Sequence, residues 1–369
     1  MFGKIIDKIF KKNWSDAELK KYLGNFKSTF LAYSNNEKIR EGAASGGTTT
    51  SLLITAIKER LCDGVILCRT VINDGKVRPK FFIAKSKEEI LTSQGSKYVE
   101  TDFIKVVPDI IRNFNGKLVV VGLPCDISFL KYMMSKDHKI SSKIVLTIGL
   151  FCGHNSRREL VDNITKKLEK KVKSKVNDFV FRKGKWRGNM YISFENGVCL
   201  KLSSSFFNLY HNLFFFCQKK CLACNDHFGY NADISIGDVW LYKFKNEDIK
   251  RNAVIIRTEI GQKLFSKAIQ NKIITSEEVN PDLILDGQSR IAPFHYNVSS
   301  RVKAGKIFGI KLVDNVNEKV RWNHFINAFI TILNIKLSES KVGKKIIFLI
   351  PRFLLKVYLY LKKGLEVIK

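Results

Sequence analysis

Three of the chain's eight cysteines crowd into the segment CQKKCLAC, where Cys217, Cys221 and Cys224 fall within eight residues. The last two form a Cys-x-x-Cys pair, whose thiolates can bind one iron or zinc ion from a single turn. Disulfides, a zinc site and an iron–sulfur cluster are the three chemistries that this group allows. Eight cysteines in 369 residues is far below the density of a disulfide scaffold, so disulfides are the least expected of the three.

Two further cysteines stand where apolar strands give way to helices. KLVVVGLPC ends in Cys125, and KIVLTIGLFC ends in Cys152. If these strands are parallel neighbours, both thiols lie at the carboxyl edge of the sheet, where open α/β sheets usually bind ligands. A helix N-terminus also favours the thiolate, which is the form that binds metal. Taken alone, either cysteine is also explained as a small buried hydrophobe.

The spacing favours a cluster over a zinc ion. A structural zinc prefers a second local pair of Cys or His, and no zinc-finger pair follows the nearby His227. A cubane cluster accepts cysteines from distant strand ends. We therefore predict a metal centre with Cys217 as a reserve ligand. The four main ligands are Cys125, Cys152, Cys221 and Cys224. The remaining Cys62, Cys68 and Cys199 lie in or beside apolar stretches and are expected to be structural.

Two glycine-containing turns have the chemistry of a phosphate site. EGAASGGTTTSLL places glycines before a helix, where backbone amides and hydroxyls can reach an anion. The candidates there are Ser45, Gly46, Gly47 and Thr48. SQGSKYVET adds a lysine that can neutralise phosphate and a tyrosine that can stack on a flat ring. The candidates there are Gly95, Ser96, Lys97 and Tyr98. A plain helix N-cap and a surface turn explain the same two segments, since neither matches a Walker A loop or GxGxxG.

The elements that must position these residues alternate between strand and helix. Apolar runs predict strands at 63–70, 80–86, 117–123, 143–151 and 253–258. Helical patterns occupy 48–61, 87–91, 126–134, 156–171 and 261–271. This alternation predicts an α/β fold with a parallel sheet and helices on both faces.

Near residue 172 the pattern changes to two-residue alternation, with a hairpin turn at Asn196–Gly197. The sequence therefore predicts a smaller, β-rich part that also bears the clustered cysteines and the strand ADISIGDVW, which makes the fold mixed α+β. The expected parts are an N-terminal basic helix (1–25), an α/β region with the two glycine turns (26–171), a C-terminal region with the hairpin and Cys-x-x-Cys pair (172–310) and a basic amphipathic helical tail (311–369).

The chain is strongly basic, with 64 Lys and Arg against 34 Asp and Glu and a net charge of +30. Such a charge indicates an anionic partner, or simply lysines solvated along the whole surface. No nucleic-acid motif is visible, so we expect no nucleic-acid partner. With no signal peptide and no run of about 20 apolar residues, we expect a cytoplasmic protein.

The end of the chain, residues 343–369, has apolar residues bracketed by lysines and interrupted at Pro351 and Arg352. It can lie flat on an anionic membrane, at the inner face of the cell membrane. Packing of this segment on the protein body or on a partner protein is the alternative explanation.

Several separated segments resemble motifs of one protein family, and they occur along the chain in the same order as in that family. AASGGTTTSLL and DGVIL are followed by QGSKY, GLPCDI, IGLFC, FRKGKW, CLAC and ADISIGDVW, which together cover residues 40 to about 300. In these segments the chain resembles the beta subunit of coenzyme F420 hydrogenase and dehydrogenase, a family of iron–sulfur flavoproteins. The ordered set is specific although each motif is short.

The resemblance implies an oxidoreductase that holds FAD and a [4Fe–4S] cluster and, in members from methanogens, exchanges hydride with coenzyme F420. The family's cluster cysteines fall on the same four positions named above, and its flavin region falls on the two glycine turns. Asp233 and Asp238 match an acidic strand, and they either orient backbone near the cluster or cap turns. No catalytic acid or base is identified. FAD reduced by a two-electron donor is expected to pass electrons singly to the cluster and on to a partner protein.

Three departures qualify what the resemblance implies. Many relatives carry an N-terminal ferredoxin module that this chain lacks, so a separate ferredoxin-like protein or subunit is expected as redox partner. The order Cys152–Gly153–His154 replaces the family's Cys-His-Gly, and Leu241 stands where glycine usually follows the tryptophan. Bacterial relatives sit among genes for surface polysaccharides. An accessory protein of polysaccharide biosynthesis that keeps the fold and cluster is therefore the alternative function, and a basic membrane-surface scaffold is a third.

Overall fold

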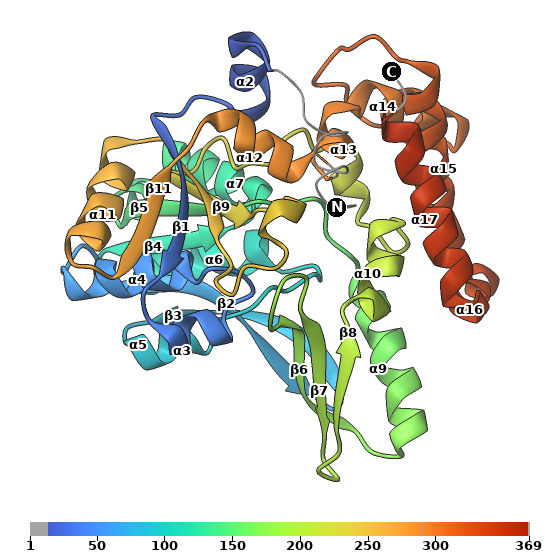
Figure 1. Ribbon diagram of the computed structural model, residues 1–369, viewed down its shortest axis with the longest axis horizontal. Coiled ribbons are helices and arrows are strands. Elements are labelled where there is room, and N and C mark those ends of the chain that lie inside the picture. The colour runs from blue at the N-terminus through green and yellow to red at the C-terminus, as the bar shows by residue number, and fades with distance from the viewer. Residues whose placement is uncertain (1–13, 290, 368–369) are drawn as a thin grey trace.

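A computed structural model describes residues 14–289 and 291–367. Residues 1–13, the first half of the predicted basic helix, lie outside the described residues. The described part of that segment contains α2 (Asp16–Leu23), which begins with a capping box of Ser15 and Glu18. The predicted mixed α/β architecture is confirmed, with a large sheet between helices and a smaller sheet beside it (Figure 1).

The large sheet has eight strands within the described residues and is parallel at its centre. In spatial order they are β11 (Ile274–Glu278), β1 (Ser28–Ser34), β10 (Asn252–Ile256), β9 (Ile234–Asp238), β5 (Ile144–Leu150), β4 (Leu118–Gly122), β2 (Gly64–Asn73) and β3 (Lys76–Ala84). β2, β4, β5 and β9 run parallel, whereas the pairs at both edges are antiparallel. The expected parallel pairing of the strands before Cys125 and Cys152 is confirmed, with Val120 of β4 opposite Thr147 of β5.

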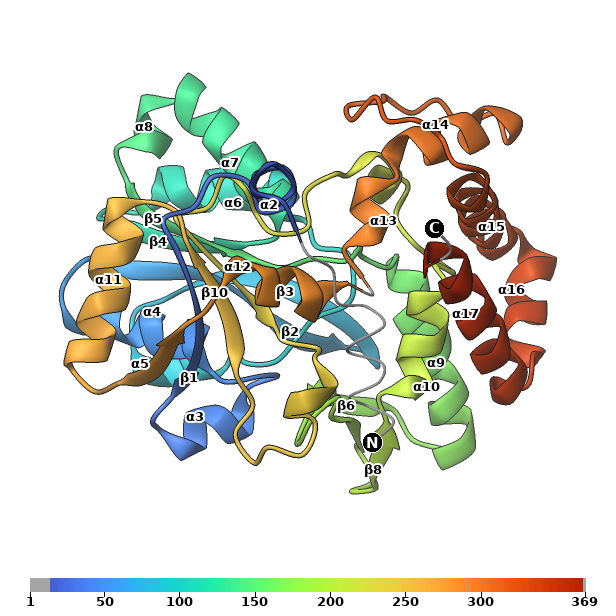
Figure 2. The same ribbon diagram turned by 45° about the horizontal axis from the view of Figure 1, so that its top comes forward.

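Alternation of side chains along the strands builds a core on each face of this sheet. In β4, Val119 and Val121 point into one core, and Leu118 and Val120 point into the other. The first core is covered by α4 (Thr48–Lys58), α5 (Lys87–Leu91) and α11 (Glu259–Gln270). The second is covered by α6 (Phe103–Asn113), α7 (Pro124–Lys136) and α8 (His138–Ser141), as Figure 2 shows. α2 and α12 (Pro281–Gln288) cover β1 and β10, and α3 (Glu37–Gly42) leads from β1 into the first glycine turn.

The smaller sheet is an antiparallel meander of β6 (Val176–Lys183), β7 (Asn189–Phe194) and β8 (Cys199–Ser203). The predicted hairpin turn is confirmed between β7 and β8, where Gly197 has a φ of +82°. This sheet packs on α9 (Arg158–Val172) and α10 (Ser205–Asn212). The clustered cysteines lie beyond it, around the 3-10 turn η1 (Lys219–Ala223). β9, β10 and β11 return to the large sheet, and the 3-10 turn η2 (Tyr242–Phe244) lies between β9 and β10.

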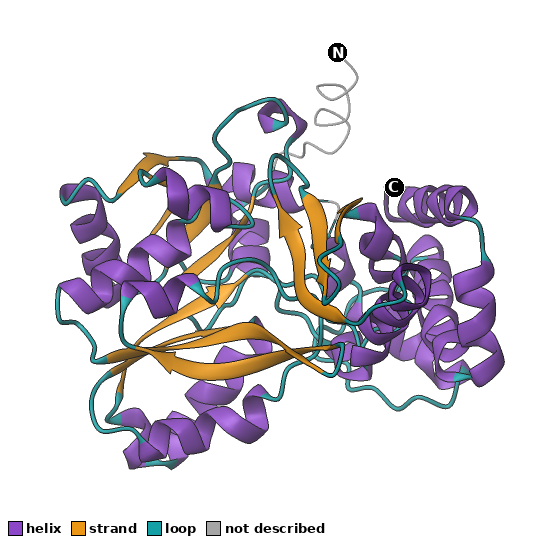
Figure 3. Ribbon diagram, turned by 90° about the horizontal axis from the view of Figure 1, so that it is seen from below, coloured by secondary structure: helices purple, strands orange, loops and turns teal. Residues whose placement is uncertain are grey.

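Helices close the chain along one side of the molecule, away from the large sheet (Figures 1 and 3). They are α13 (Pro293–Tyr296), α14 (Val298–Ile307), α15 (Trp322–Glu339), α16 (Lys341–Leu349) and α17 (Arg352–Val367). α14 packs on η1 and α15, and α17 packs on α10 and α15. Of the helices that the structure describes, none combines the length and apolar character that crossing a bilayer requires.

Candidate functional site

The four predicted ligands come from three separate places at the carboxyl edge of the large sheet. Cys125 is the second residue of α7, close after β4, and Cys152 follows the end of β5 by two residues. Cys221 lies in η1, and Cys224 caps it, donating its backbone N–H to the Cys221 carbonyl over 3.2 Å. The Cys152 N–H donates to the carbonyl of His227 over 3.0 Å. This bond ties the end of β5 to the segment that follows the Cys-x-x-Cys pair.

The four thiols are close enough for charge on one to disfavour charge on the others. Burial first, and then Cys221, Cys125 and Cys224, raises the pKa of Cys152 well above its usual value. Desolvation by the surrounding protein, followed by Asp126, raises the pKa of Cys125 to about 12 although the residue keeps an exposed face, and Cys224 and Cys221 add to the effect. The structure therefore brings the four predicted ligands together. All of them are free cysteines.

Cys217, the reserve ligand, stands behind Cys221. It is fully buried, and the hydrogen bond between the two thiols is the main cause that lowers the pKa of Cys221. Burial raises the pKa of Cys217 well above its usual value. Cys217 thus favours ionisation of Cys221 over its own, while its thiol donates to the Gln218 carbonyl over 3.5 Å. We interpret Cys217 as a neighbour that supports a ligand.

Within residues 14–289 and 291–367, no three Cys, His, Asp or Glu side chains are arranged to hold a single metal ion. A tetrahedral zinc ion binds its sulfur ligands at about 2.3 Å, which requires the sulfurs to lie within roughly 4 Å of one another. A four-iron cluster binds one thiolate at each corner, so its sulfurs stand farther apart. The choice of a cluster over zinc therefore stays a prediction for these four thiols.

Two side chains that no local motif predicts hold the cysteine loops in place. His295 of α13 bridges two carbonyls, with Nδ1 3.1 Å from that of Cys224 and Nε2 2.8 Å from that of Gly153. The guanidinium of Arg301 in α14 is buried, and its Nε donates to the Leu222 carbonyl over 2.6 Å. Its Nη2 donates to the Cys224 carbonyl over 3.3 Å. Two of the three segments that supply thiols, those of Cys152 and of the Cys221–Cys224 pair, are therefore anchored from the C-terminal helices.

Positive charge accompanies the thiols. No carboxylate pairs with Arg301 among the described residues, and its guanidinium lies 3.9 Å from the centre of the Phe294 ring. Burial lowers the pKa of Arg301 to about 10, whereas Cys224, Cys217 and Cys221 oppose that change. Burial also acts to lower the pKa of Lys220, but neighbouring acidic groups, Cys125 first, leave it raised. Two cations thus face the thiols, where they can offset the negative charge of thiolates.

The first glycine turn caps α4. Gly47 has a φ of +80°, which favours glycine. A side chain at Gly46 would place its Cβ 2.8 Å from the Lys250 carbonyl and 2.9 Å from that of Ala32. The Thr48 hydroxyl is buried and has no hydrogen-bond partner in the part of the chain that the structure describes. Because it lies at a helix N-terminus, which favours anions, a phosphate oxygen is the partner that it suits.

An ion pair lies next to this turn. Arg182 donates to both carboxylate oxygens of Asp238, over 2.8 Å and 2.6 Å. Burial acts to raise the pKa of Asp238, but the charge and the hydrogen bonds of Arg182 lower it below its usual value. With Trp186 and Trp240 these side chains line a cavity of about 20 Å³. Cofactor pockets typically measure several hundred Å³. The turn therefore offers groups that suit phosphate, but the adjoining cavity cannot seat a flavin ring as it stands.

The second turn uses its polar groups internally. The Lys97 ammonium donates to the carbonyls of Ser93, Gln94 and Gly95, and burial lowers the pKa of Lys97 to about 8. The Tyr98 ring packs among Phe181, Phe207 and His211. Neither side chain has the free end that the sequence interpretation gave it. Ser96 is half-buried, and Gly95, at a φ of +85°, faces open space.

Asp233 and His227 are occupied in the fold. Asp233 accepts hydrogen bonds from the N–H and hydroxyl of Thr147, both over 2.7 Å, and from the hydroxyl of Thr258 over 3.0 Å. It therefore joins β5 to the N-terminus of α11. The His227 ring pairs with Gln288, with Nε2 3.0 Å from Oε1. These contacts give both residues a structural role.

Two of the three remaining cysteines behave as the sequence predicts. Cys62 is buried and Cys68 is partly buried, both within cores of the large sheet. Cys199 instead lies exposed on β8, the outer strand of the smaller sheet, so its interpretation as a packed residue is wrong. Short alternation at a sheet edge leaves one face in solvent, and Cys199 is on that face.

Comparisons with known proteins agree on one family. The models for the coenzyme F420 hydrogenase/dehydrogenase beta subunit match residues 29–108 with the N-terminal part and 115–282 with the C-terminal part. The coenzyme F420 hydrogenase subunit beta of Methanosarcina barkeri is 27% identical over 272 residues, which cover 72% of this chain and 87% of the relative. The protein of the same name from Methanococcus voltae is 26% identical, with 70% and 86% covered.

A solved structure shows the same fold. It is a chain in a xenon-derivatised F420-reducing [NiFe] hydrogenase complex from Methanosarcina barkeri. The two chains superpose with a TM-score of 0.61 at 23% sequence identity, covering 80% of this chain and 98% of the other.

Proposed function

The chain belongs to the coenzyme F420 hydrogenase/dehydrogenase beta subunit family, an oxidoreductase family, and we propose that it is an electron-transferring subunit with a [4Fe–4S] cluster and FAD. The proposed cluster ligands are Cys125, Cys152, Cys221 and Cys224. The observation that carries the proposal is the convergence of these thiols from three separate segments at one sheet edge, with Cys221 buried, Cys152 and Cys224 half-buried and Cys125 exposed.

The residues around the thiols fit a cluster, which when bound exchanges single electrons. This chain's own part is to hold four thiolates and offset their charge. The cations of Arg301 and Lys220 offset the charge. The His295 ring lies between the Cys152 loop and the Cys224 turn, with one nitrogen near a carbonyl of each, and as a neutral imidazole it donates to one of the two.

The phosphate end of FAD is proposed to lie at the first glycine turn, on Ser45, Gly46, Gly47 and Thr48. The unpartnered Thr48 hydroxyl supports this placement. A flavin can exchange both hydride and single electrons. Gly95 and Ser96 are proposed to line the open side of the neighbouring turn, while Lys97 and Tyr98 shape that turn from within. Since the adjoining cavity is only about 20 Å³, flavin binding requires side chains there to move.

The proposed two-electron donor is coenzyme F420 or a similar hydride carrier, because relatives that align over about 70% of this chain bear the name coenzyme F420 hydrogenase subunit beta. The proposed partner is another redox protein, either a ferredoxin-like protein or a further subunit. The alternative is an accessory role in surface polysaccharide biosynthesis that keeps the fold and the cluster without this donor.

Anaerobic purification with iron, acid-labile sulfide and zinc analysis tests the cluster. We expect about four irons and four sulfides per chain and an electron paramagnetic resonance signal after reduction. Cys152→Ser should remove most of the iron, whereas Cys199→Ser, a matched change at an exposed cysteine, should keep it. Stoichiometric zinc without iron, or equal iron loss in both variants, would overturn the cluster assignment. A full cluster that coenzyme F420 never reduces would favour the accessory role.

Thr48→Val tests the flavin site separately. The change removes a hydroxyl with no partner in the described residues, so the melting temperature should not fall. Loss of one charge-assisted hydrogen bond to phosphate should weaken FAD binding by about tenfold to a hundredfold. Thr165→Val is the matched control, since this threonine is equally buried but lies in α9. Unchanged FAD affinity in Thr48→Val would remove this residue from the site.

A further inference from the structure

The two last helices expose an apolar surface that the fold does not use. α17 packs its inner side on α10 and α15, burying Leu355 and the Lys362 ammonium, which donates to the Asn327 side chain. The opposite side of α16 and α17 carries large apolar side chains that face solvent, which we call the outer stripe. Its members are Ile346, Leu349, Phe353, Val357, Tyr360 and Leu361.

The outer stripe follows helix geometry and is not scattered. At about 100° per residue, Phe353, Val357, Tyr360 and Leu361 fall within roughly 100° of one another around α17. Leu349 is 79% exposed, Phe353 66% and Leu361 68%. Single exposed hydrophobic residues are ordinary, but a row of them along consecutive turns marks a surface that binds something apolar.

Positive charge borders the outer stripe on one side. Around the axis of α17, Arg352 lies about 100° and Lys356 about 60° from Phe353, on the side away from Leu361. On α16, Lys345 lies about 100° from Ile346 in the same direction. All three are exposed, and none pairs with a carboxylate in residues 14–289 and 291–367. A helix with exposed apolar residues flanked by lysine and arginine is suited to the interface of an anionic membrane.

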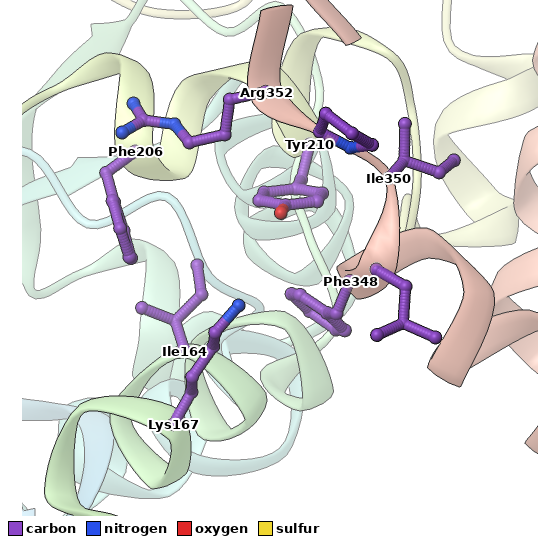
Figure 4. Close-up of a pocket in the computed structure, with 9 residues that line it drawn as sticks. Ile164, Lys167, Phe206, Tyr210, Phe348, Ile350 and Arg352 are labelled. Carbon is purple, nitrogen blue, oxygen red and sulfur yellow. The ribbon is translucent and has the colours of Figure 1, made fainter. Parts of the chain in front are cut away.

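An apolar recess adjoins the stripe where α16 meets α17. It measures about 230 Å³ and is lined by Phe206, Tyr210 and Phe348 among others, with Lys167 and Arg352 reaching over it from opposite sides (Figure 4). Arg352 lies 5.0 Å from the Phe206 ring and donates to the Ser205 hydroxyl over 2.9 Å. Leu349 belongs to both the recess and the stripe. This arrangement suits a phospholipid, because the two cations can bind its phosphate while the apolar recess receives part of its acyl chains.

We propose that α16 and α17 seat the protein on an anionic phospholipid bilayer, with the outer stripe at the acyl boundary and the flanking cations on the phosphates. Because the inner side of α17 is packed against the protein, only its outer side is available, so the helix lies in the plane of the membrane. The family match ends at residue 282, so a subunit that binds the shared part of the family need not cover these helices. The net charge of +30 favours the same surface.

Vesicle flotation with the full chain, purified with its cofactors, tests the apolar part. We expect binding to phosphatidylcholine vesicles that contain phosphatidylglycerol, and little binding to phosphatidylcholine alone. Val357→Asp with Leu361→Asp should abolish binding while thermal unfolding stays unchanged, because both side chains already face solvent. Val313→Asp, at a residue that is 76% exposed in a loop before α15, is the matched control and should bind as the wild type does.

The contribution of the flanking lysines to vesicle binding is tested by the double variant Lys345→Gln with Lys356→Gln. Each lysine near an anionic surface contributes roughly fivefold to binding, so the pair should weaken it by about 30-fold and flatten its salt dependence. Lys76→Gln with Lys80→Gln removes the same charge from exposed positions on β3 and should have little effect. Binding retained in the double aspartate variant, equal binding to both vesicle types, or no binding at all would each overturn the proposal. None of these outcomes depends on the cluster or the flavin.

Discussion

Replacing Arg301 is the most direct test of how a buried cation affects the proposed cluster. Arg301→Met keeps a long apolar side chain but removes the charge and three hydrogen bonds, two of them to the turn that carries Cys221 and Cys224. Arg301→Lys keeps the charge but loses the planar fork that binds several carbonyls at once. The two variants therefore separate the electrostatic contribution from the geometric one.

The expected magnitude follows from where the guanidinium lies. It touches the carbonyl of Cys224, so its charge is on the order of 7 Å from that residue's sulfur. At an effective dielectric constant near 20, a unit charge at that distance changes the energy of one added electron by about 2 kcal/mol. For a one-electron couple this equals on the order of 100 mV. Since a nearby cation stabilises the reduced and more negative cluster, Arg301→Met should lower the potential by about that amount.

Anaerobic redox titration followed by electron paramagnetic resonance measures this potential, and iron analysis of the same samples measures cluster retention. Arg301→Met should shift the potential, whereas Arg301→Lys should shift it far less and lose some iron because its turn is held less firmly. An unchanged potential in an Arg301→Met sample with full iron would refute the electrostatic reasoning. Absence of iron in the wild-type protein would instead refute the cluster itself, so the two failures are distinguishable.

Three further changes test other parts of the structure. Cys217→Ser should keep the full iron content, because Cys217 is a buried neighbour of Cys221 whose thiol donates to the Gln218 carbonyl; iron loss as large as that of Cys221→Ser would make it a ligand. Burial lowers the pKa of His211 to about 4, so the unfolded chain binds more protons as the pH falls from 6.5 to 4 and about 3 kcal/mol of stability is lost there. In His211→Phe, urea unfolding at several pH values should show a shallower acid slope, and an unchanged slope would contradict this cause. Gly46→Ala forces a Cβ to within 2.9 Å of two carbonyls and should lower the free energy of unfolding by about 1–3 kcal/mol, whereas Gly364→Ala, in open space on α17, should raise it slightly; equal unfolding curves would contradict the close packing.

The strands and the paired strand-end cysteines were predictable because their signals are local. A run such as KLVVVGLPC specifies a buried strand, its end and the thiol that follows, and parallel pairing then places Cys125 and Cys152 at the same edge. All the expected strands and helices in the described residues appear, with ends displaced by a few positions. β1 and β11 were not predicted, since STFLAYS and ITSEE carry polar residues that the sheet tolerates near its edge.

The supporting residues were not predictable from the sequence. Arg301 and His295 lie far along the chain from the cysteine loops that they hold, and a buried arginine with only carbonyl partners has no sequence signature. Lys97 shows the same limit at a local motif. A lysine beside a glycine turn suggests a phosphate ligand, yet here its ammonium is used by three carbonyls of its own turn. Local motifs identify side chains whose chemistry suits a ligand. Packing then decides which of these side chains remain available to bind one.

Net charge shows why a property of the whole chain needs a structure before it can be interpreted. A charge of +30 suits both a specific anionic partner and lysines spread over all surfaces. The fold distinguishes these cases locally, because Lys76 and Lys80 border no apolar surface on β3, whereas Lys356 borders the outer stripe. A uniform cationic surface would bind anionic vesicles by charge alone and release them completely in high salt. A cationic edge beside exposed apolar side chains should instead leave a salt-resistant fraction, so the residual binding at high salt measures the contribution of the stripe directly.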